Sequence, residues 1–205
     1  MRLNCNSFFD GDFGYLNLND FYLENRHLIT DSKDPSQIQS ALNALNKNTY
    51  GGYAEDRKDI WKGTYMDKTQ TYVHLGIDIN VPPETPIKSP FDAVVIEAFT
   101  DLDTKIGWGG RLILVQRSDT QLKMPFLVLG HLNPGNLVNT AFKKYFNKGE
   151  VLGHVGTWPT NGNTFNHLHV QCITKNLLNT DFDGYGFKSD LENNPDPFRI
   201  DFSAN

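Results

Sequence analysis

The feature that most constrains the fold is a series of short strand-like segments between residues 72 and 173. These segments are rich in β-branched residues or alternate apolar and polar residues, and they span residues 72–81, 92–99, 111–117, 126–132, 149–155 and 167–173. Gly, Pro and polar residues separate them, as expected for turns between strands. Because the strands are so short and so closely spaced, the sequence predicts a mainly β fold. Its core would be an antiparallel sheet or sandwich of about six short strands, not an alternation of strands and helices.

The segments before and after this strand-rich part predict a chain in three parts. Residues 71–178 would form the β domain, residues 179–205 a C-terminal tail that wraps it, and residues 1–70 an N-terminal flanking region packed on it. The N-terminal region is too long for a linker, and its aromatic side chains are better explained by packing than by solvation. These aromatic residues include Phe8, Phe9, Phe13, Tyr15, Phe21 and Tyr22.

One short helix is predicted within the N-terminal region, and long loops for the rest of it. Asp34 is a candidate N-cap, and Pro35 suits the first helical position. The apolar residues that follow recur at helical spacing. They are Ile38, Ala41, Leu42 and Leu45.

Composition excludes several classes of function. A net charge of −5 lacks the basic footprint of a nucleic-acid-binding protein. No run of about 18 apolar residues is present, so no membrane-spanning helix is expected. Asp10 and Asp12 interrupt the stretch where a signal peptide needs unbroken apolar residues. We therefore expect a cytoplasmic protein with Cys5 and Cys172 as free thiols, the alternative being a secreted or periplasmic protein whose leader was removed. The sequence leaves the oligomeric state open.

Histidines concentrate in the strand-rich part, together with a carboxylate. Residues of equal parity on a strand share a face, which places His74, Gly76 and Asp78 on one face and His167 and His169 on another. The glycine leaves room between ligands that must converge on one ion. Two histidines and an aspartate are good ligands for Zn²⁺ and leave a fourth position for water.

These motifs, taken in order, resemble the lysostaphin/LytM-type metallopeptidases, which cut peptide bridges of bacterial cell walls. The resemblance covers about half of the chain, and the order and spacing of its pieces match the family. They are His74–Asp78, residues 83–94, Gly107–Gly109, Gly130–Leu132, residues 148–156 and Asn166–His169. The resemblance implies that His74, Asp78 and His169 bind zinc and that His131 and His167 are the catalytic histidines. It does not say which of the two is the general base.

Several positions depart from the family pattern. Glu84 stands where the family usually has glycine, Leu129 where it has an aromatic residue, and Val170-Gln171 where it favours Phe-Glu. The loop of residues 157–162 is also unlike that of typical cell-wall hydrolases, so substrate preference does not transfer. Residues 51–57, 183–186 and 194–197 look more like copies of this domain in cytoplasmic multidomain enzymes.

The sequence therefore predicts a zinc-dependent metalloendopeptidase that hydrolyses peptide bonds with a metal-activated water. Its substrate would be a peptidoglycan cross-link or a related small peptide. The main alternative is a catalytically inactive version of the same domain, kept for binding or as a scaffold. A non-haem iron enzyme would use a similar triad, but it has no use for two further histidines. A carrier domain of the biotinyl or lipoyl type would need a modified lysine at a position where this chain lacks one.

Overall fold

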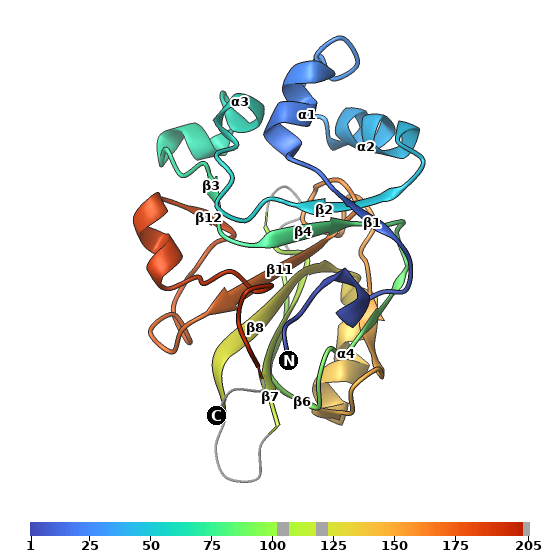
Figure 1. Ribbon diagram of the computed structural model, residues 1–205, viewed down its shortest axis with the longest axis vertical. Helices are drawn as coiled ribbons and strands as arrows, with labels where there is room; N and C mark the ends of the chain where they lie inside the picture. Colours follow the sequence, from blue (N-terminus) through green and yellow to red (C-terminus); the bar gives the residue numbers. More distant parts are fainter. Residues whose placement is uncertain (102–106, 118–122, 203–205) are drawn as a thin grey trace.

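The computed structural model describes residues 1–101, 107–117 and 123–202. Its centre is one large sheet, shown in Figure 1, with the strand order β1-β2-β4-β11-β8-β7-β6-β9. Neighbouring strands are antiparallel except for β1 and β2, which are parallel. In chain order the strands are β1 (Phe13–Tyr15), β2 (Asn48–Gly51), β4 (Ile77–Asn80), β6 (Ala93–Thr100), β7 (Gly110–Gln116), β8 (Lys123–Leu132), β9 (Tyr145–Phe146) and β11 (Leu168–Ile173).

Two small antiparallel sheets complete the β structure. One pairs β5 (Pro86–Lys88) with β10 (Val151–His154), and the other pairs β3 (Val73–His74) with β12 (Tyr185–Gly186). The second small sheet joins the segment before β4 to the C-terminal tail. The mainly β, largely antiparallel fold predicted from the sequence is confirmed.

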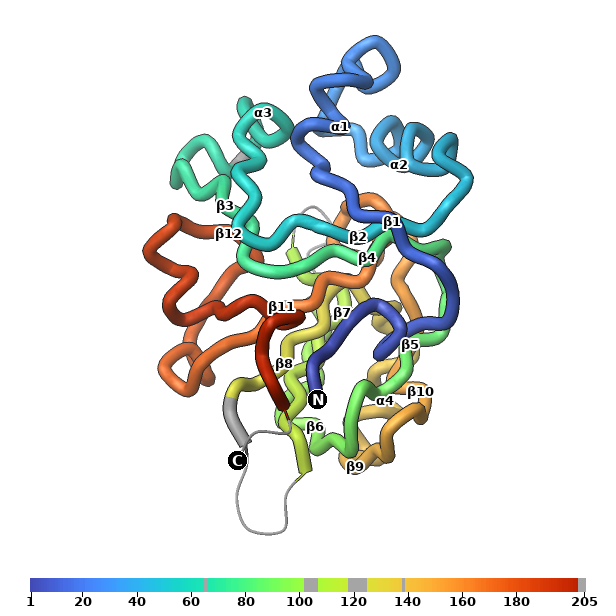
Figure 2. Tube along the Cα trace, in the orientation of Figure 1, coloured from blue at the N-terminus to red at the C-terminus, as the bar shows by residue number. Residues whose placement is uncertain are grey.

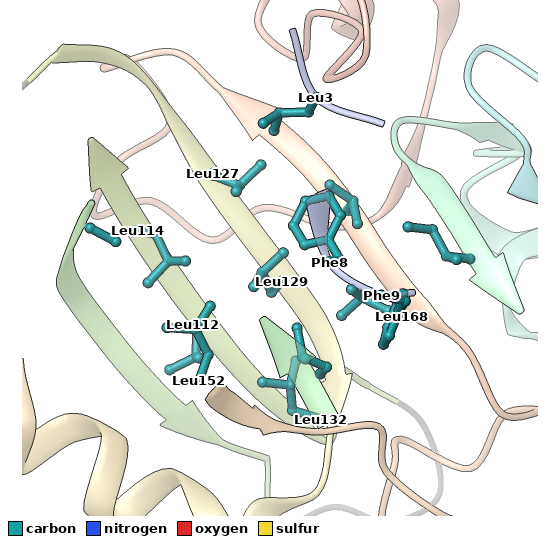
Figure 3. Packing of buried hydrophobic residues seen from close by; sticks show 14 of the residues in the cluster. Leu3, Phe8, Phe9, Leu112, Leu114, Leu127, Leu129, Leu132, Leu152 and Leu168 are labelled. Carbon is teal, nitrogen blue, oxygen red and sulfur yellow. The ribbon is translucent and has the colours of Figure 1, made fainter. Parts of the chain in front are cut away.

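The large sheet has two different faces because side chains alternate along each strand. One face, here called the core face, carries the main hydrophobic cluster. Figure 3 shows Leu112 and Leu114 of β7 beside Leu127 and Leu129 of β8, with Phe8 and Phe9 near Leu168 of β11. The opposite face, here called the site face, carries a smaller apolar cluster. It contains Ile113, Val115, Phe126, Val128 and Ile173.

The N-terminal residues build part of the core. The short helix η1 (Cys5–Ser7) leads into Phe8 and Phe9, which are 0% and 2% exposed. The backbone carbonyl of Phe8 accepts a hydrogen bond of 2.9 Å from the amide of Lys88 in β5. Figure 2 shows this N-terminal segment passing close to β5. Strand β2, from the same region, lies inside the large sheet beside β4.

Three helices gather beyond the β1-β2-β4 end of the sheet, at the top of Figure 1: α1 (Leu18–Glu24), α2 (Pro35–Ala44) and α3 (Lys58–Trp61). The predicted helix is α2, and the carboxylate of Asp34 caps it by accepting from the amide of Ser36 at 3.0 Å. Their apolar side chains form a separate cluster that includes Phe165, from the loop before β11. The N-terminal region thus packs directly on the loop that leads to His167.

Four features of the secondary structure differ from the predicted elements or were not predicted. The predicted strand 72–81 is two strands, β3 and β4, with a bend at Leu75 and Gly76. The segment 149–155 contains β10, which pairs with β5 outside the large sheet. Helix α4 (Pro134–Lys143), which packs beside β6 and β10, follows β8. Two short 3₁₀ segments were also not predicted: η2 (Tyr65–Lys68) in the N-terminal region and η3 (Lys188–Glu192) in the C-terminal tail.

No helix in the described ranges is long and apolar enough to cross a membrane. Cys5 and Cys172 are both buried and free. Burial raises the pKa of the Cys5 thiol to about 12 and also raises that of Cys172, so both thiols stay protonated and unreactive near neutral pH.

Candidate metal centre

The site is built on one row of residues that crosses the site face of the large sheet. In this row Gly51 of β2 pairs with Asp78 of β4, Asp78 pairs with His169 of β11, and His169 pairs with Gly130 of β8. Residues paired across a sheet project to the same face. Asp78 and His169 are therefore brought side by side by strand register, and the glycines on either side admit the Leu16 carbonyl at Gly51 and the Trp108 ring at Gly130.

His74 reaches the same point from a different sheet. It lies on β3, and the bend at Leu75 and Gly76 turns the chain before β4 begins. Gly76 lies against the imidazole of His169, because a Cβ at this position would stand 2.6 Å from Cε1 and Nε2 of that ring. A side chain at residue 76 would displace His169. The need for glycine here is therefore steric.

Ligand-type atoms of three predicted residues converge in the buried interior of the site. His74 Nε2 lies 3.0 Å from His169 Nδ1 and 3.2 Å from Asp78 Oδ1, and Asp78 Oδ1 lies 3.1 Å from His169 Nδ1. All three side chains are at most 3% exposed. Among the described residues, these three are also a group whose ligand atoms all lie within 4.8 Å of one another.

The remaining ring nitrogens of these histidines are held by acceptors. His74 Nδ1 lies 3.0 Å from the carbonyl oxygen of Gly52, and His169 Nε2 lies 2.8 Å from Gln171 Oε1. The Gln171 amide nitrogen donates to Asn194 Oδ1 at 2.6 Å, which fixes Oε1 as the atom that faces His169. In the neutral ring, His74 therefore carries its proton on Nδ1 and His169 carries its proton on Nε2. The other nitrogen of each ring directs its lone pair towards Asp78.

The electrostatics of this arrangement fit a bound cation. Burial, followed by the nearby charge of Arg57, lowers the pKa of His74 to about 3, so this ring is neutral. Burial opposes ionisation of Asp78, but His74, His167 and Arg57 together hold its pKa well below the usual value. Two imidazole nitrogens and a carboxylate oxygen face one another at contact distance. The donor set of two nitrogens and one oxygen suits a divalent ion such as Zn²⁺.

His131 and His167 lie beside the candidate ligands. Their ring centroids are 4.5 Å apart, and His167 Nε2 lies 3.3 Å from Asp78 Oδ1. Each Nδ1 faces a backbone carbonyl, that of Asn161 at 2.8 Å for His131 and that of Phe165 at 2.9 Å for His167. In both rings Nε2 is therefore the atom that is left for chemistry.

The backbone at His131 is unusual. Its φ of 63° lies in the left-handed region, which costs energy for a residue with a side chain. The conformation is held by hydrogen bonds of 2.8 Å from the His131 amide to the Trp108 carbonyl and from the Gly156 amide to the His131 carbonyl. The indole of Trp108 stacks on the His131 ring with centroids 6.3 Å apart. Burial and the adjacent His167 lower the pKa of His131 well below its ordinary value, so the ring is neutral.

An open cleft runs past these histidines. One cavity of about 420 Å³ is lined by Trp108, His131 and His169 together with residues 181–185 of the C-terminal tail. A narrower cavity of about 100 Å³ also contacts His131 and His169 and extends to Trp61 and Phe165. Because the two cavities share these histidines, they form one groove across the site. The tail forms one end of the groove and the N-terminal region forms the other.

Two further residues bind the candidate ligands and were not predicted as site residues. Arg57 is 1% exposed and donates from NH1 to Asp78 Oδ2 at 2.7 Å. Gln171 holds the His169 ring, as described above. Gln171 stands where the family pattern favours glutamate, and its Oε1 faces His169 Nε2 at 2.8 Å. Sequence signals existed for both, because Gln171 follows the HxH motif and Arg57 ends one of the outlying pieces that resemble the family.

The other two histidines lie apart from the centre. His27 is exposed, and His154 Nδ1 contacts the side-chain amide of Asn136 at 3.0 Å. Neither belongs to the group of candidate ligands.

The comparison with known families follows from this site. Residues 72–180 match the profile described as Peptidase family M23. The chain belongs to this family. The match makes it a hydrolase of a peptidase family with lysostaphin-like, LytM-domain character, and it contains every predicted site residue. Residues 1–71 and 181–205 lie outside the matched range.

Solved structures of M23 peptidases are similar to part of the chain. Lysostaphin from Staphylococcus simulans, an antimicrobial peptidase, is 20% identical over 55% of this chain and 40% of its own, with a TM-score of 0.37. The catalytic domain of the prophage-encoded M23 protein EnpA from Enterococcus faecalis is 19% identical over 50% of this chain and 69% of its own, with a TM-score of 0.36. LytU is 22% identical over 62% of this chain and 77% of its own, with a TM-score of 0.37. No curated protein matches the chain.

Proposed function

We propose that this M23 family member is a zinc-dependent metalloendopeptidase. His74, Asp78 and His169 would hold one Zn²⁺, and His131 and His167 would act as the acid–base pair. The observation that carries this proposal is the convergence of His74 Nε2, Asp78 Oδ1 and His169 Nδ1 within 3.0–3.2 Å of one another. When bound, zinc would acidify a water molecule and polarise the scissile carbonyl.

His131 and His167, which are not candidate metal ligands, would supply the proton transfers. Because His131 is neutral and its Nδ1 proton is held by the Asn161 carbonyl, its Nε2 can accept a proton from an attacking water. In His167, Nδ1 faces the Phe165 carbonyl, so Nε2 is the nitrogen that is left for chemistry. In a protonated state this ring would donate to the oxyanion that forms on the substrate carbonyl. The reverse assignment uses the same geometry, and the pH dependence of single variants would separate the two.

The groove suits an extended peptide as the substrate. It is open at the surface and passes the candidate centre, with Trp61 and Phe165 towards one end and Asp181 and Asp183 towards the other. A peptidoglycan cross-link or a related small peptide agrees with membership of the M23 family. Because the chain spans only 40% of the length of lysostaphin, the activity of the whole protein is part of this proposal.

Hydrolysis assays with controlled metal content would test the proposal. The protein should be stripped with a chelator, loaded with one equivalent of zinc and offered cross-linked peptidoglycan and glycine-rich peptides. We expect new amino groups to appear only in the zinc-loaded sample. A protein that binds zinc and peptidoglycan but releases no amino groups would be a catalytically inactive, binding version of the domain. A protein that binds no zinc would contradict the proposal at its first step.

A further inference from the structure

Arg57 is a buried residue outside the range that matches the family, and it binds the Asp78 oxygen that faces away from the histidines. The carboxylate of Asp78 has two differently occupied oxygens: Oδ1 faces the three histidines, and Oδ2 accepts from Arg57 NH1 at 2.7 Å. Arg57 NH1 also donates to the hydroxyl of Tyr185 at 2.8 Å. One guanidinium nitrogen thus joins the candidate metal ligand to the C-terminal tail.

The guanidinium itself is fixed from its other edge. Both Nε and NH2 of Arg57 donate to Glu55 Oε2 at 3.2 Å, and Glu55 Oε1 accepts from the amide of Asn19 in α1 at 2.6 Å. The backbone around it is paired with the segment that carries His74, since the amide of Arg57 donates to Tyr72 and the amide of His74 donates to Glu55. A planar fork held in this way has little freedom to leave Asp78.

Glycine at position 52 is part of the same arrangement. A Cβ at this residue would stand 2.3 Å from Arg57 NH2 and 2.6 Å from His74 Nδ1. The backbone carbonyl of Gly52 is the acceptor for His74 Nδ1. The short segment from Gly52 to Arg57 therefore contacts two of the three candidate ligands from behind, and it belongs entirely to the N-terminal region.

The charges explain why an arginine is needed here. Asp78 and Glu55 are both at least 96% buried in their side chains, and Arg57 lies between them. One guanidinium cannot balance two carboxylates, so the buried group keeps a net negative charge directed at the histidines through Asp78 Oδ1. A carboxylate with one oxygen bound to a guanidinium has only the other oxygen left for a metal ion.

We propose that Arg57 is a positioning residue that binds Asp78 Oδ2 and so makes Asp78 a single-oxygen ligand of the metal. This inference rests on the zinc site of the proposed function. Without Arg57, Asp78 would be free to rotate and to bind the ion through both oxygens, or to turn away from it. Loss of an outer hydrogen-bond partner of a metal ligand typically lowers metal affinity by about 10–100-fold.

Three variants of the full chain separate positioning from folding. Arg57→Met with Glu55→Gln removes the guanidinium together with one buried negative charge, so that only one buried carboxylate is left without its partner. Glu55→Gln alone is the matched control, because it removes the same negative charge and keeps Arg57; its single carbonyl oxygen can still accept from Arg57, while its NH2 group replaces the oxygen that accepts from the Asn19 amide. Arg57→Lys tests rescue by a residue that keeps the charge and loses the fork. Circular dichroism establishes for each variant that the fold is retained.

Two measurements then decide, and neither uses catalytic activity. Competition with a chromophoric chelator gives the zinc dissociation constant, and the visible spectrum of the Co²⁺-substituted protein reports the coordination number. We expect the double variant to bind zinc about 10–100-fold more weakly and its cobalt bands to weaken, as expected when a second carboxylate oxygen binds. Glu55→Gln should resemble the original protein, and Arg57→Lys should lie between the two.

The outcomes distinguish this inference from the proposed function. If the original protein binds no zinc, the proposed function fails before Arg57 is tested. If the original protein binds zinc and the folded double variant has the same dissociation constant and the same cobalt spectrum, Arg57 serves the fold alone and the inference is wrong. If the double variant does not fold, Arg57→Lys is the test. An unchanged cobalt spectrum and an unchanged zinc affinity in that variant would show that the forked guanidinium of Arg57 is not needed to position Asp78.

Discussion

Asp78 Oδ1 lies 3.1 Å from His169 Nδ1 although 91 residues separate the two in the chain. The two residues are direct partners in the antiparallel pairing of β4 and β11. Two of the three candidate ligands are therefore held by the pairing of the large sheet, and His74 joins them from β3. A site built on paired strands is held more precisely than one built on loops.

Truncation of any one candidate ligand should abolish stoichiometric zinc binding. We expect Asp78→Ala, His74→Ala and His169→Ala to retain well below one zinc per chain after dialysis, because two remaining ligands do not form a closed site. Elemental analysis of purified, folded protein measures this. His154→Ala is the control, since that residue lies outside the group of candidate ligands. Full zinc retention in Asp78→Ala would show that the ligand assignment is wrong.

Substitution of the other two histidines should separate metal binding from catalysis. His131→Ala and His167→Ala are expected to keep zinc and to lose about 10²–10⁴-fold in the rate of peptide hydrolysis, the usual contribution of general acid–base catalysis. Rates at saturating substrate, together with zinc content, test this. Hydrolysis near the original rate in both variants would exclude this mechanism.

The hydrogen bond from His169 to Gln171 gives a third prediction. Gln171→Leu removes the acceptor for His169 Nε2, so the ring is free to rotate or to change tautomer, and zinc affinity should fall by about 10–100-fold. Gln171→Glu keeps an acceptor for His169 Nε2 but loses the donor to Asn194 Oδ1, so it should bind zinc more tightly than Gln171→Leu. The zinc dissociation constants of the two variants are the measurement. Equal affinities for Gln171→Leu and the original protein would mean that this contact does not orient the ligand.

The metal-free protein should become less stable as the pH falls. Burial and the charge of Arg57 lower the pKa of His74 from 6.5 to about 3 in the folded chain. The unfolded chain therefore binds a proton at this residue between these two values that the folded chain does not bind. The free energy of unfolding thus decreases as the pH falls through this window. The depressed pKa of Asp78 acts in the same direction below its ordinary value of 3.8.

Urea denaturation at about pH 7.5 and at about pH 5, in the presence of a chelator, measures this dependence. His74→Asn has no proton to gain at this position and should show a smaller decrease in stability between the two conditions. An equal decrease in both proteins would assign the pH dependence to other groups.

Much of the β domain was predictable because a strand leaves a local pattern of apolar and β-branched residues in the sequence. The segments 92–99, 111–117, 126–132 and 167–173 correspond to β6, β7, β8 and β11, whose alternation of side chains matches the two faces of the sheet. Helix α4 was missed even though Asn133 caps it and Pro134 occupies its first turn, the same start signal as Asp34 and Pro35. Strand β2 had no comparable signal, since its four residues, NTYG, take their conformation from pairing with β4.

The candidate site shows the same division between local and tertiary information. The HxxxD and HxH motifs are visible in the sequence, but His74 and Asp78 do not share one strand as the parity rule predicted. They belong to β3 and β4 on either side of a bend, and His167 precedes β11. Their convergence comes from strand register and from the bend at Gly76. The contact between Arg57 and Asp78 depends on tertiary packing, which the resemblance of residues 51–57 to related domains does not specify.

The N-terminal region gives the last prediction. A fragment of residues 71–205 should be insoluble or much less stable than the full chain, because the missing region supplies Phe8 and Phe9 to the core and β2 to the large sheet. Phe8→Ala in the full chain should itself lower the free energy of unfolding by about 3–5 kcal/mol, the usual cost of truncating a buried phenylalanine. Phe142→Ala is the control: this side chain is 85% exposed, and its removal should change stability by about 0.5 kcal/mol or less.

The same fragment distinguishes a structural role from an inhibitory one. The N-terminal region also contributes Trp61 to the groove and Arg57 to the back of Asp78, so its loss should impair zinc binding as well as folding. A soluble 71–205 fragment that binds zinc as tightly as the full chain and hydrolyses peptides faster would identify residues 1–70 as an inhibitory pro-region. Loss of solubility together with loss of zinc affinity is the outcome we expect, because the deletion removes Arg57 and Glu55 together and leaves the buried carboxylate of Asp78 without its ion-pair partner.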